Sequence, residues 1–574
     1  MCGIAGIVIS EARRYRAAME RMVGALAHRG PDGSGVMEFD GAVLGHTRLS
    51  IVDLAGGAQP MRSAVDGRVG VTFNGEIYGY QTLRKELAGE YPFRTMSDTE
   101  VILAVYQRER GEPVVWGASL DQLPGMFAFG LWDEEERVFL AARDRFGEKP
   151  FYYARFVDEE GRAGLVFASE MKAILASGLV RPKLDRDALG HYLQNLYVHP
   201  LQTIYENVQT LGPGRVLSFY AGDLVVRRYW ELPEERGEVD VTEAVEEFRR
   251  LFAQAVGRQM VADVPVGAFL SGGLDSSTVV GLAAKVQPGV QTFAFRFDKG
   301  FDETPYAAAV AAMHGTTHRV LEDTDVDIGG LMVEMAGVYD EPFADSSNIP
   351  TYLISKLARE HLKVVLTGDG GDELLAGYGW YRPLIEAGAG ASISEGRLSQ
   401  SRYFSDATLA KFGLAPSAMP KRIDRTHTVD DALRMDLVDY MPGDILVKID
   451  RASMAHGLEL RAPFLDVDLA TFLIGLPWRL KIDGTGDKLI LRKAFAALWP
   501  REIVNRPKQG FGAPVAEWLG RAGVKELVKT RLCDRRHPVF GLLPFEGMRV
   551  AVERGSFQAW ILLTLALWLE RHPL

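Results

Sequence analysis

The stretch FLSGGLDSS, residues 269–277, joins an apolar strand to a helix, and the second half of the chain is organised around it. The strand is expected in VPVGAFL and the helix in SSTVVGLAAKV. Strand and helix signals keep alternating afterwards, in VQTFAFRF, TPYAAAVAAMHG, HRVLE, TYLISKLARE and LKVVLTG. Helix-length segments between apolar strands predict βαβ units, and with them a parallel α/β sheet that has helices on both faces.

The same stretch has the chemistry of a phosphate site. Gly272 and Gly273 let the backbone approach phosphate oxygens, and Ser276 and Ser277 stand where free N–H groups at a helix start favour an anion. No lysine lies in this loop, so it is not a P-loop. Asp275 would repel a phosphate unless a cation lay between them, and it therefore implies Mg²⁺. Taken alone, the motif fits a glycine-rich turn before a helix equally well.

Residues up to about 217 follow another pattern, with short β-type runs separated by turn residues, as in WDEEERVF. This pattern fits antiparallel hairpins. Two stretches, 80–87 and 98–109, are expected to be helical. We therefore predict an α+β domain over residues 1–217 and a second domain over residues 218–574, in which the polar stretch 384–440 is not placed.

The composition excludes several classes of protein. The 574 residues are 47% hydrophobic and 25% charged, which is ordinary for a globular chain. A net charge of −11 argues against a nucleic-acid or membrane partner. The two cysteines, Cys2 and Cys533, fit a reducing cytoplasm. No basic region precedes the apolar N-terminal run, and the most apolar stretch, 559–569, is shorter than the roughly 20 residues that a bilayer needs, so it is expected to be a core helix.

Cys2 is a candidate nucleophile. If Met1 is removed, Cys2 has both a thiol and a free α-amine, whose pKa of about 7.7–8.0 makes it partly a neutral base near pH 7. The amine can take the thiol proton directly or through one water. A cysteine at position 2 by chance is the alternative, and this residue alone does not exclude it.

The first 200 residues or so contain motifs that resemble class II glutamine amidotransferase domains. That family has the N-terminal-nucleophile fold, in which two antiparallel sheets lie between helical layers. One departure is Gly79, where relatives often have Asn, at a turn. The matching motifs are MCGIAG, HRGPDGSG (28–35), GHTRLSIVDL (45–54), FNGEIY (73–78), SDTEVIL (97–103), GMFAFGLWD (125–133), RDRFGEKPFYY (143–153) and FASEMKAI (167–174).

The resemblance implies glutamine hydrolysis with Cys2 as nucleophile. The Asn74 side-chain amide and the Gly75 backbone N–H would form the oxyanion hole. A cationic fork suits the α-carboxylate of glutamine and acidic side chains suit its α-ammonium, although any one of these charges could also be a solvated surface group. The implied glutamine-binding residues are Arg48, Ile51, Val52, Asn74, Gly75, Glu76 and Asp98.

The second half resembles the ATP-pyrophosphatase (PP-loop) synthetase domain. VLTGDGGDELLAGY (365–378) follows a second apolar strand, and DEPFADSS (340–347) and ILVKIDRASMAHGLELRAPFLD (445–466) narrow the resemblance to the glutamine-hydrolysing asparagine synthetase family. ATP would be a substrate. The implied ATP-binding residues are Leu270, Ser271, Gly272, Gly273, Asp275, Ser276, Phe295, Thr367 and Gly368.

The resemblance also implies roles for four further groups. Asp275 and Asp372 would hold Mg²⁺, Lys448 would neutralise charge on the adenylate and the leaving pyrophosphate, and Glu341 would handle the protons of ammonia. Lys448 could instead be a surface lysine, but its apolar neighbours Ile445, Leu446, Val447 and Ile449 argue against an exposed helix face.

The implied function is glutamine-dependent asparagine synthesis from aspartate, and three alternatives stay open. A relative could amidate another carboxylate, such as a natural product, peptide or polysaccharide precursor. A β-lactam synthetase would not need the intact Cys2, Arg48 and NGE, and a non-catalytic binding protein would not need SGGLDSS and GDGGDE. The partners expected are therefore small molecules, and the oligomeric state stays open, with a homodimer among the alternatives.

Overall fold

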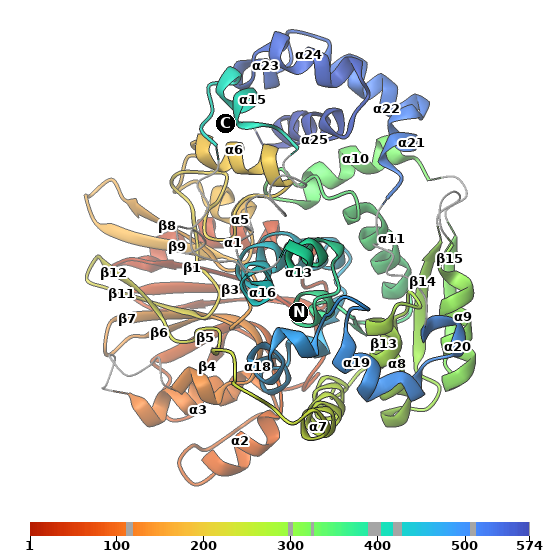
Figure 1. Ribbon diagram of the computed structural model, residues 1–574. Coiled ribbons are helices and arrows are strands. Elements are labelled where there is room, and N and C mark those ends of the chain that lie inside the picture. The colour runs from red at the N-terminus through yellow and green to blue at the C-terminus, as the bar shows by residue number, and fades with distance from the viewer. Residues whose placement is uncertain are drawn as a thin grey trace.

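The protein is described by a computed structural model that covers residues 1–110, 119–296, 302–322, 326–387, 403–416, 428–504, 513–572 and 574. These residues form two six-stranded antiparallel sheets and one five-stranded parallel sheet (Figure 1). The two antiparallel sheets and their helices are called the first domain, and the parallel sheet begins the second domain.

The two sheets of the first domain pack face to face, as the N-terminal-nucleophile fold requires. Phe167 of one sheet stacks on Phe139 of the other, with ring centroids 4.8 Å apart. One sheet has the order β10 (Gln209–Thr210), β8 (Tyr152–Val157), β9 (Ala163–Ala168), β1 (Gly3–Val8), β3 (Ala42–Arg48), β2 (Gly33–Glu38). The other has the order β12 (Asp223–Arg228), β11 (Arg215–Tyr220), β7 (Val138–Arg143), β6 (Gly125–Asp133), β5 (Val69–Ile77), β4 (Met61–Arg62).

Helices cover both outer faces of this pair of sheets. Helices α1 (Arg16–Ala25) and α5 (Met171–Ala176) pack on the β1 sheet, and α2 (Tyr80–Leu87) and α3 (Thr99–Glu109) pack on the β5 sheet. The helices predicted at 80–87 and 98–109 are therefore present. The boundary predicted at residue 217 falls inside β11, and its partner β12 extends this sheet to Arg228.

The second domain contains the predicted parallel sheet. Its order is β15 (Thr317–Glu322), β14 (Gln291–Arg296), β13 (Val266–Phe269), β16 (Val364–Leu366), β17 (Glu459–Arg461). Apolar side chains of α7 (Val241–Gln259), α8 (Leu274–Val286), α9 (Thr304–His314) and α18 (Val467–Gly475) cover one face. Helix α11 (Asn348–Arg359) covers the other face, so helices lie on both sides as expected.

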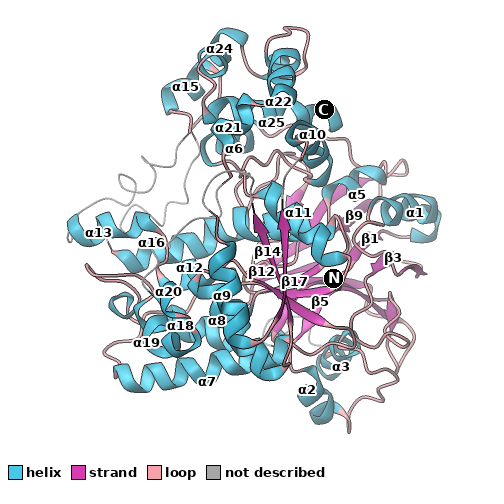
Figure 2. Ribbon diagram, turned by 90° about the vertical axis from the view of Figure 1, so that its right-hand side faces the viewer, coloured by secondary structure: helices cyan, strands magenta, loops and turns pink. Residues whose placement is uncertain are grey.

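The rest of the second domain is helical (Figure 2). Short helices lie between β16 and β17: α12 (Gly371–Leu375), α13 (Arg382–Ala387), α16 (Val429–Met435), a π-helix (Asp436–Ile445) and α17 (Leu446–Met454). Two more, α19 (Leu489–Phe495) and α20 (Arg501–Val504), come after β17. A C-terminal bundle contains α21 (Val515–Gly520), α22 (Ala522–Leu527), α23 (Val539–Leu542), α24 (Phe545–Glu553) and α25 (Phe557–Arg571), with α6 (Arg186–Asn195), α10 (Ile328–Val338) and α15 (Asp406–Lys411) beside it.

The polar stretch 384–440 lies partly outside the described residues, and its described parts belong to α13, α15, α16 and the π-helix. The apolar stretch 559–569 is the buried core of α25, as predicted. Within the described part of the chain, no helix combines the length and apolar character that crossing a bilayer requires.

A buried ion-pair network joins the two domains. Arg29 binds both oxygens of Asp450 at 2.8 and 2.9 Å and also binds Glu170 at 2.8 Å. Arg451 binds Glu170 at 2.9 Å and Asp340 at 3.3 Å. All five side chains are less than 5% exposed. Because an unpaired buried charge is costly, each domain depends on the other for the partners of these groups.

We predict that Arg29→Met lowers stability strongly, because it leaves Asp450 buried without its main partner. Removing one member of such a pair costs about 3–5 kcal/mol, and the thermal midpoint in calorimetry should fall by about 5–10 °C. Arg14→Met is the matched control, since its side chain is 58% exposed and pairs with Glu160 at the surface. Equal midpoints for the two variants would contradict the role given to this network.

Candidate active sites

The first candidate site surrounds Cys2, immediately before β1. The thiol is buried, and its sulfur lies 3.9 Å from the carbonyl oxygen of Leu49. The backbone N–H of Cys2 donates to Oδ1 of Asn74 at 2.9 Å, which orients the amide of Asn74. Nδ2 of Asn74 is buried and has no hydrogen-bond partner among the described residues. A donor in this position fits the predicted oxyanion hole.

The backbone conformation next to Asn74 on β5 requires a glycine at position 75. Its φ is +148°, and a Cβ there would lie 2.0 Å from the carbonyl oxygen of Met126 on β6. Only glycine avoids both the strained φ and the clash. With glycine at this position, β5 can pair closely with β6 while Asn74 and Gly75 lie beside Cys2.

Charged groups of both signs lie near Cys2. Arg48, at the end of β3, donates to the carbonyl oxygens of Asp53 at 2.7 Å and Leu54 at 3.1 Å, so its guanidinium holds the loop that contains Ile51 and Val52. Ile51 is buried and Val52 is half-buried. These hydrogen bonds hold the guanidinium of Arg48 in place at the edge of this site.

Glu76 and Asp98 are both buried; Glu76 lies close enough to Cys2 to act on its thiol, and Asp98 lies close enough to act on Glu76. Burial raises the pKa of Asp98 to about 6, although N–H donors such as that of Ile77, at 2.9 Å, oppose the shift. Burial also raises the pKa of Glu76 well above its ordinary value, and Arg461 only partly offsets this. A bound ammonium group would keep both carboxylates ionised, as expected for the subsite of an α-ammonium.

Two residues of the second domain also reach this site, and the sequence analysis did not assign them. Glu459 accepts from the N-terminal amine of Met1 at 2.5 Å, and Arg461 lies 3.2 Å from Glu76. Both belong to the ELR run of the motif 445–466. Two charged residues in a short stretch between apolar residues were the available signal, because such charges in a buried strand need partners elsewhere.

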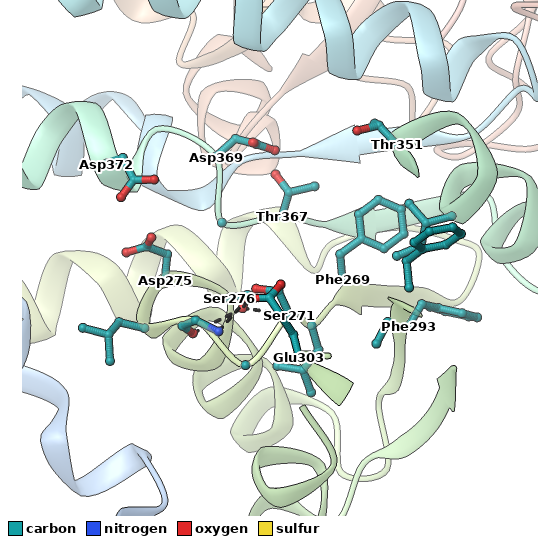
Figure 3. Close-up of a pocket in the computed structure, with 18 of the residues that line it drawn as sticks. Phe269, Ser271, Asp275, Ser276, Phe293, Glu303, Thr351, Thr367, Asp369 and Asp372 are labelled. Atoms are coloured by element: carbon teal, nitrogen blue, oxygen red, sulfur yellow. Dashed lines mark hydrogen bonds between the residues drawn. The ribbon is translucent and has the colours of Figure 1, made fainter. Parts of the chain in front are cut away.

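The second candidate site is a cavity of about 270 Å³ at the carboxyl ends of β13 and β16 (Figure 3). Ligands bind at this edge in open parallel sheets. Gly272, with φ +73°, lets the loop pass Tyr306 and Ala307, which a Cβ would meet at 2.6 and 2.7 Å. The cavity is lined by all the predicted ATP and metal residues: Leu270, Ser271, Gly272, Gly273, Asp275, Ser276, Phe295, Thr367, Gly368 and Asp372.

Lys448 also lines this cavity, from α17, and its Nζ donates to Asp345 at 3.0 Å. Burial opposes the charged form, but Asp345, Asp444 and Asp369 outweigh it and raise the pKa of Lys448 above its ordinary value. A permanent cation therefore faces the cavity, as predicted for a residue that neutralises phosphate charge.

The asparagine synthase family matches residues 247–570, and the glutamine amidotransferase domain family matches residues 1–230. The chain belongs to the asparagine synthase family. Asparagine synthetase [glutamine-hydrolyzing] 1 of Bacillus subtilis is 31% identical to it over 99% of this chain and 96% of the relative. Asparagine synthetase B of Escherichia coli is 30% identical over 93% and 86%. The solved glutamine phosphoribosylpyrophosphate amidotransferase of B. subtilis aligns with a TM-score of 0.30 and 16% identity, over 64% of this chain and 81% of that one.

The residues of this asparagine synthase cavity fit a magnesium ion. Asp275 and Asp372 stand in the first turns of two different helices, α8 and α12, and face one another (Figure 3). The buried ammonium of Lys488, which the sequence analysis did not assign, contacts Asp275 and lies 2.5 Å from Asp372. Lys488 thus already supplies positive charge to both carboxylates, and their oxygens are the kind of ligand that Mg²⁺ prefers. Within the described ranges, no cluster of three or more metal-ligating side chains occurs.

Glu341 does not line the cavity. Its Oε1 accepts from the backbone N–H of Ile204 at 2.7 Å, and burial raises its pKa to about 8. Asp369 does line the cavity, beside Thr367, and burial raises its pKa as well. Asp369 stands in the GDGGDE run of the second glycine-rich motif, so the sequence contained a better-placed acid than the one assigned.

Proposed function

We propose that this chain is a glutamine-dependent asparagine synthetase that makes asparagine, AMP and pyrophosphate from aspartate, glutamine and MgATP. The observation that supports it best is the presence of two separate sets of catalytic-type residues, one around Cys2 and one around the cavity of the parallel sheet. The relatives named above carry this activity in their names. The two cysteines, which form no disulfide, support a location in the cytoplasm.

Glutamine hydrolysis would use Cys2 after Met1 is removed. The free α-amine takes the thiol proton, and the sulfur attacks the side-chain carbonyl carbon of glutamine. Asn74 Nδ2 and the Gly75 N–H donate to the resulting oxyanion. When the C–N bond breaks, the ammonium at Cys2 returns its proton to the leaving ammonia. Water then hydrolyses the thioester, which releases glutamate.

Synthesis would take place in the cavity of the second domain. The acceptor carboxylate attacks the α-phosphorus of ATP and expels pyrophosphate, and ammonia then attacks the acyl-adenylate and expels AMP. Lys448 stabilises negative charge on the phosphates, and Asp369 is placed to take the proton that ammonia loses. Asp275 and Asp372 would hold Mg²⁺, which supplies positive charge to the phosphate oxygens.

The division of labour predicts that Cys2→Ala abolishes glutamine use but keeps synthesis from ammonium salts. The reason is that Cys2 is outside the ATP cavity and supplies only the nucleophile of the first site. Asparagine formation is measured with each nitrogen donor. Cys533→Ala is the matched control, because Cys533 is exposed and belongs to neither site, and it should keep both activities. Loss of ammonia-dependent synthesis in folded Cys2→Ala protein would contradict the assignment.

The cavity predicts cleavage between the α- and β-phosphates of ATP, because its glycine-rich loop has no lysine to stabilise a transferring γ-phosphate. ³¹P NMR should show AMP and pyrophosphate, with strict Mg²⁺ dependence. Asp275→Asn and Asp372→Asn should each reduce synthesis by about 10²-fold or more, by analogy with the loss of one oxyanion donor, while glutamine hydrolysis persists. ADP and inorganic phosphate as primary products would refute the assignment of this cavity.

A further inference from the structure

Strand β17 of the second domain has one side chain at the ATP cavity and two at the glutamine site. Side chains alternate between the two faces of a strand. Leu460 lines the ATP cavity, whereas Glu459 and Arg461 reach the first domain, where they contact Met1 and Glu76. A residue of one domain thus lies against a predicted substrate-binding residue of the other.

The guanidinium of Arg461 is held on several sides. Its Nε donates to Glu459 at 2.7 Å, and its Nη1 donates to the carbonyl oxygens of Gln259 at 2.7 Å and Val261 at 2.8 Å, at the end of α7. The side chain is fully buried, and Nη2 lies 3.2 Å from Glu76. Its position relative to Glu76 is therefore set by the fold of the second domain.

Three buried carboxylates meet here. Glu76 comes from β5, Asp98 precedes α3, and Glu459 comes from β17. Among the described residues, two cations contact this cluster: the N-terminal amine and Arg461. The ring of Tyr78 lies 5.9 Å from the guanidinium carbon of Arg461. Burial alone would favour neutral carboxyl groups, which attract an ammonium ion weakly.

We propose that Arg461 is a positioning residue for glutamine hydrolysis, supplied by the second domain, which keeps Glu76 ionised and aimed at the α-ammonium of glutamine. Glu459 balances this effect, since it holds the guanidinium while adding negative charge to the cluster. The proposal rests on the proposed function, in which Glu76 and Asp98 bind that ammonium group.

The sign of the pH dependence follows from these charges. Glutamine binding needs the Glu76 and Asp98 pair ionised, so kcat/KM falls as the pH drops through the apparent pKa of the pair. Arg461 lowers the pKa of both members, and Glu459 raises it. Loss of the Arg461 cation should move the acid limb of the profile of kcat/KM against pH to higher pH, and neutralising Glu459 should move this acid limb to lower pH.

The experiment measures glutaminase kcat and KM against pH in protein from which Met1 has been removed. Arg461→Met should raise the KM for glutamine by about 10–100-fold near pH 7, as expected for a lost charge-assisted contact, with a smaller change in kcat and an acid limb moved to higher pH. Arg461→Lys, which keeps a positive charge, should show a smaller shift of the acid limb than Arg461→Met. Glu459→Gln, which keeps the shape of the side chain, should move the limb the other way.

Arg258→Met is the matched control, because Arg258 also stands at the end of α7 but pairs with Asp466 and Asp468. It should leave KM and the acid limb unchanged. Equal shifts in Arg258→Met and Arg461→Met, or an unmoved limb in both Arg461→Met and Glu459→Gln, would overturn the proposal. If Arg461→Met does not fold, the direction of the Glu459→Gln shift decides.

The controls separate this proposal from the proposed function. Wild-type protein that hydrolyses glutamine, with Cys2→Ala protein that does not, establishes the glutaminase reaction without involving Arg461. Wild-type protein that never hydrolyses glutamine refutes the proposed function itself, and the positioning role with it.

Discussion

A buried charge needs a partner, and in this chain the partner often belongs to the other domain. Arg29 of the first domain binds Asp450 of the second, and Arg461 of the second binds Glu76 of the first. Such pairs contribute little net stability over apolar packing, but breaking one is costly. They therefore act mainly as constraints on how the domains fit together, and they fix the position of the glutamine site relative to the ATP cavity.

Strand β17 shows how short the path between the two sites is. The carbonyl oxygen of Arg461 accepts from the backbone N–H of Thr367 at 2.8 Å, and Thr367 lines the ATP cavity. The side chain of the same arginine ends at Glu76. One residue therefore contacts the wall of both sites. The glutamine site includes groups of the second domain, whereas the residues that line the ATP cavity all belong to the second domain itself.

Local motifs predicted what depends on local geometry. A strand, a glycine-rich loop and a helix place their own groups, so the ATP-binding residues and Asp372 could be assigned to one sheet edge and do line one cavity. Glu341 was assigned from a motif whose register with the cavity is not encoded locally, and the structure puts Asp369 there instead. Lys488 and Arg461 could not be assigned, because their partners lie more than one hundred residues away in the sequence.

The claim that the two sites are held together as parts of one enzyme is tested most directly by following the nitrogen from glutamine to asparagine. The enzyme is given glutamine labelled with ¹⁵N in its amide, MgATP, aspartate and an excess of unlabelled ammonium, and the asparagine is analysed by mass spectrometry. The account predicts asparagine whose amide ¹⁵N content is far above that of the bulk ammonium. Asparagine with the isotopic composition of the bulk ammonium, or no asparagine at all, would contradict it.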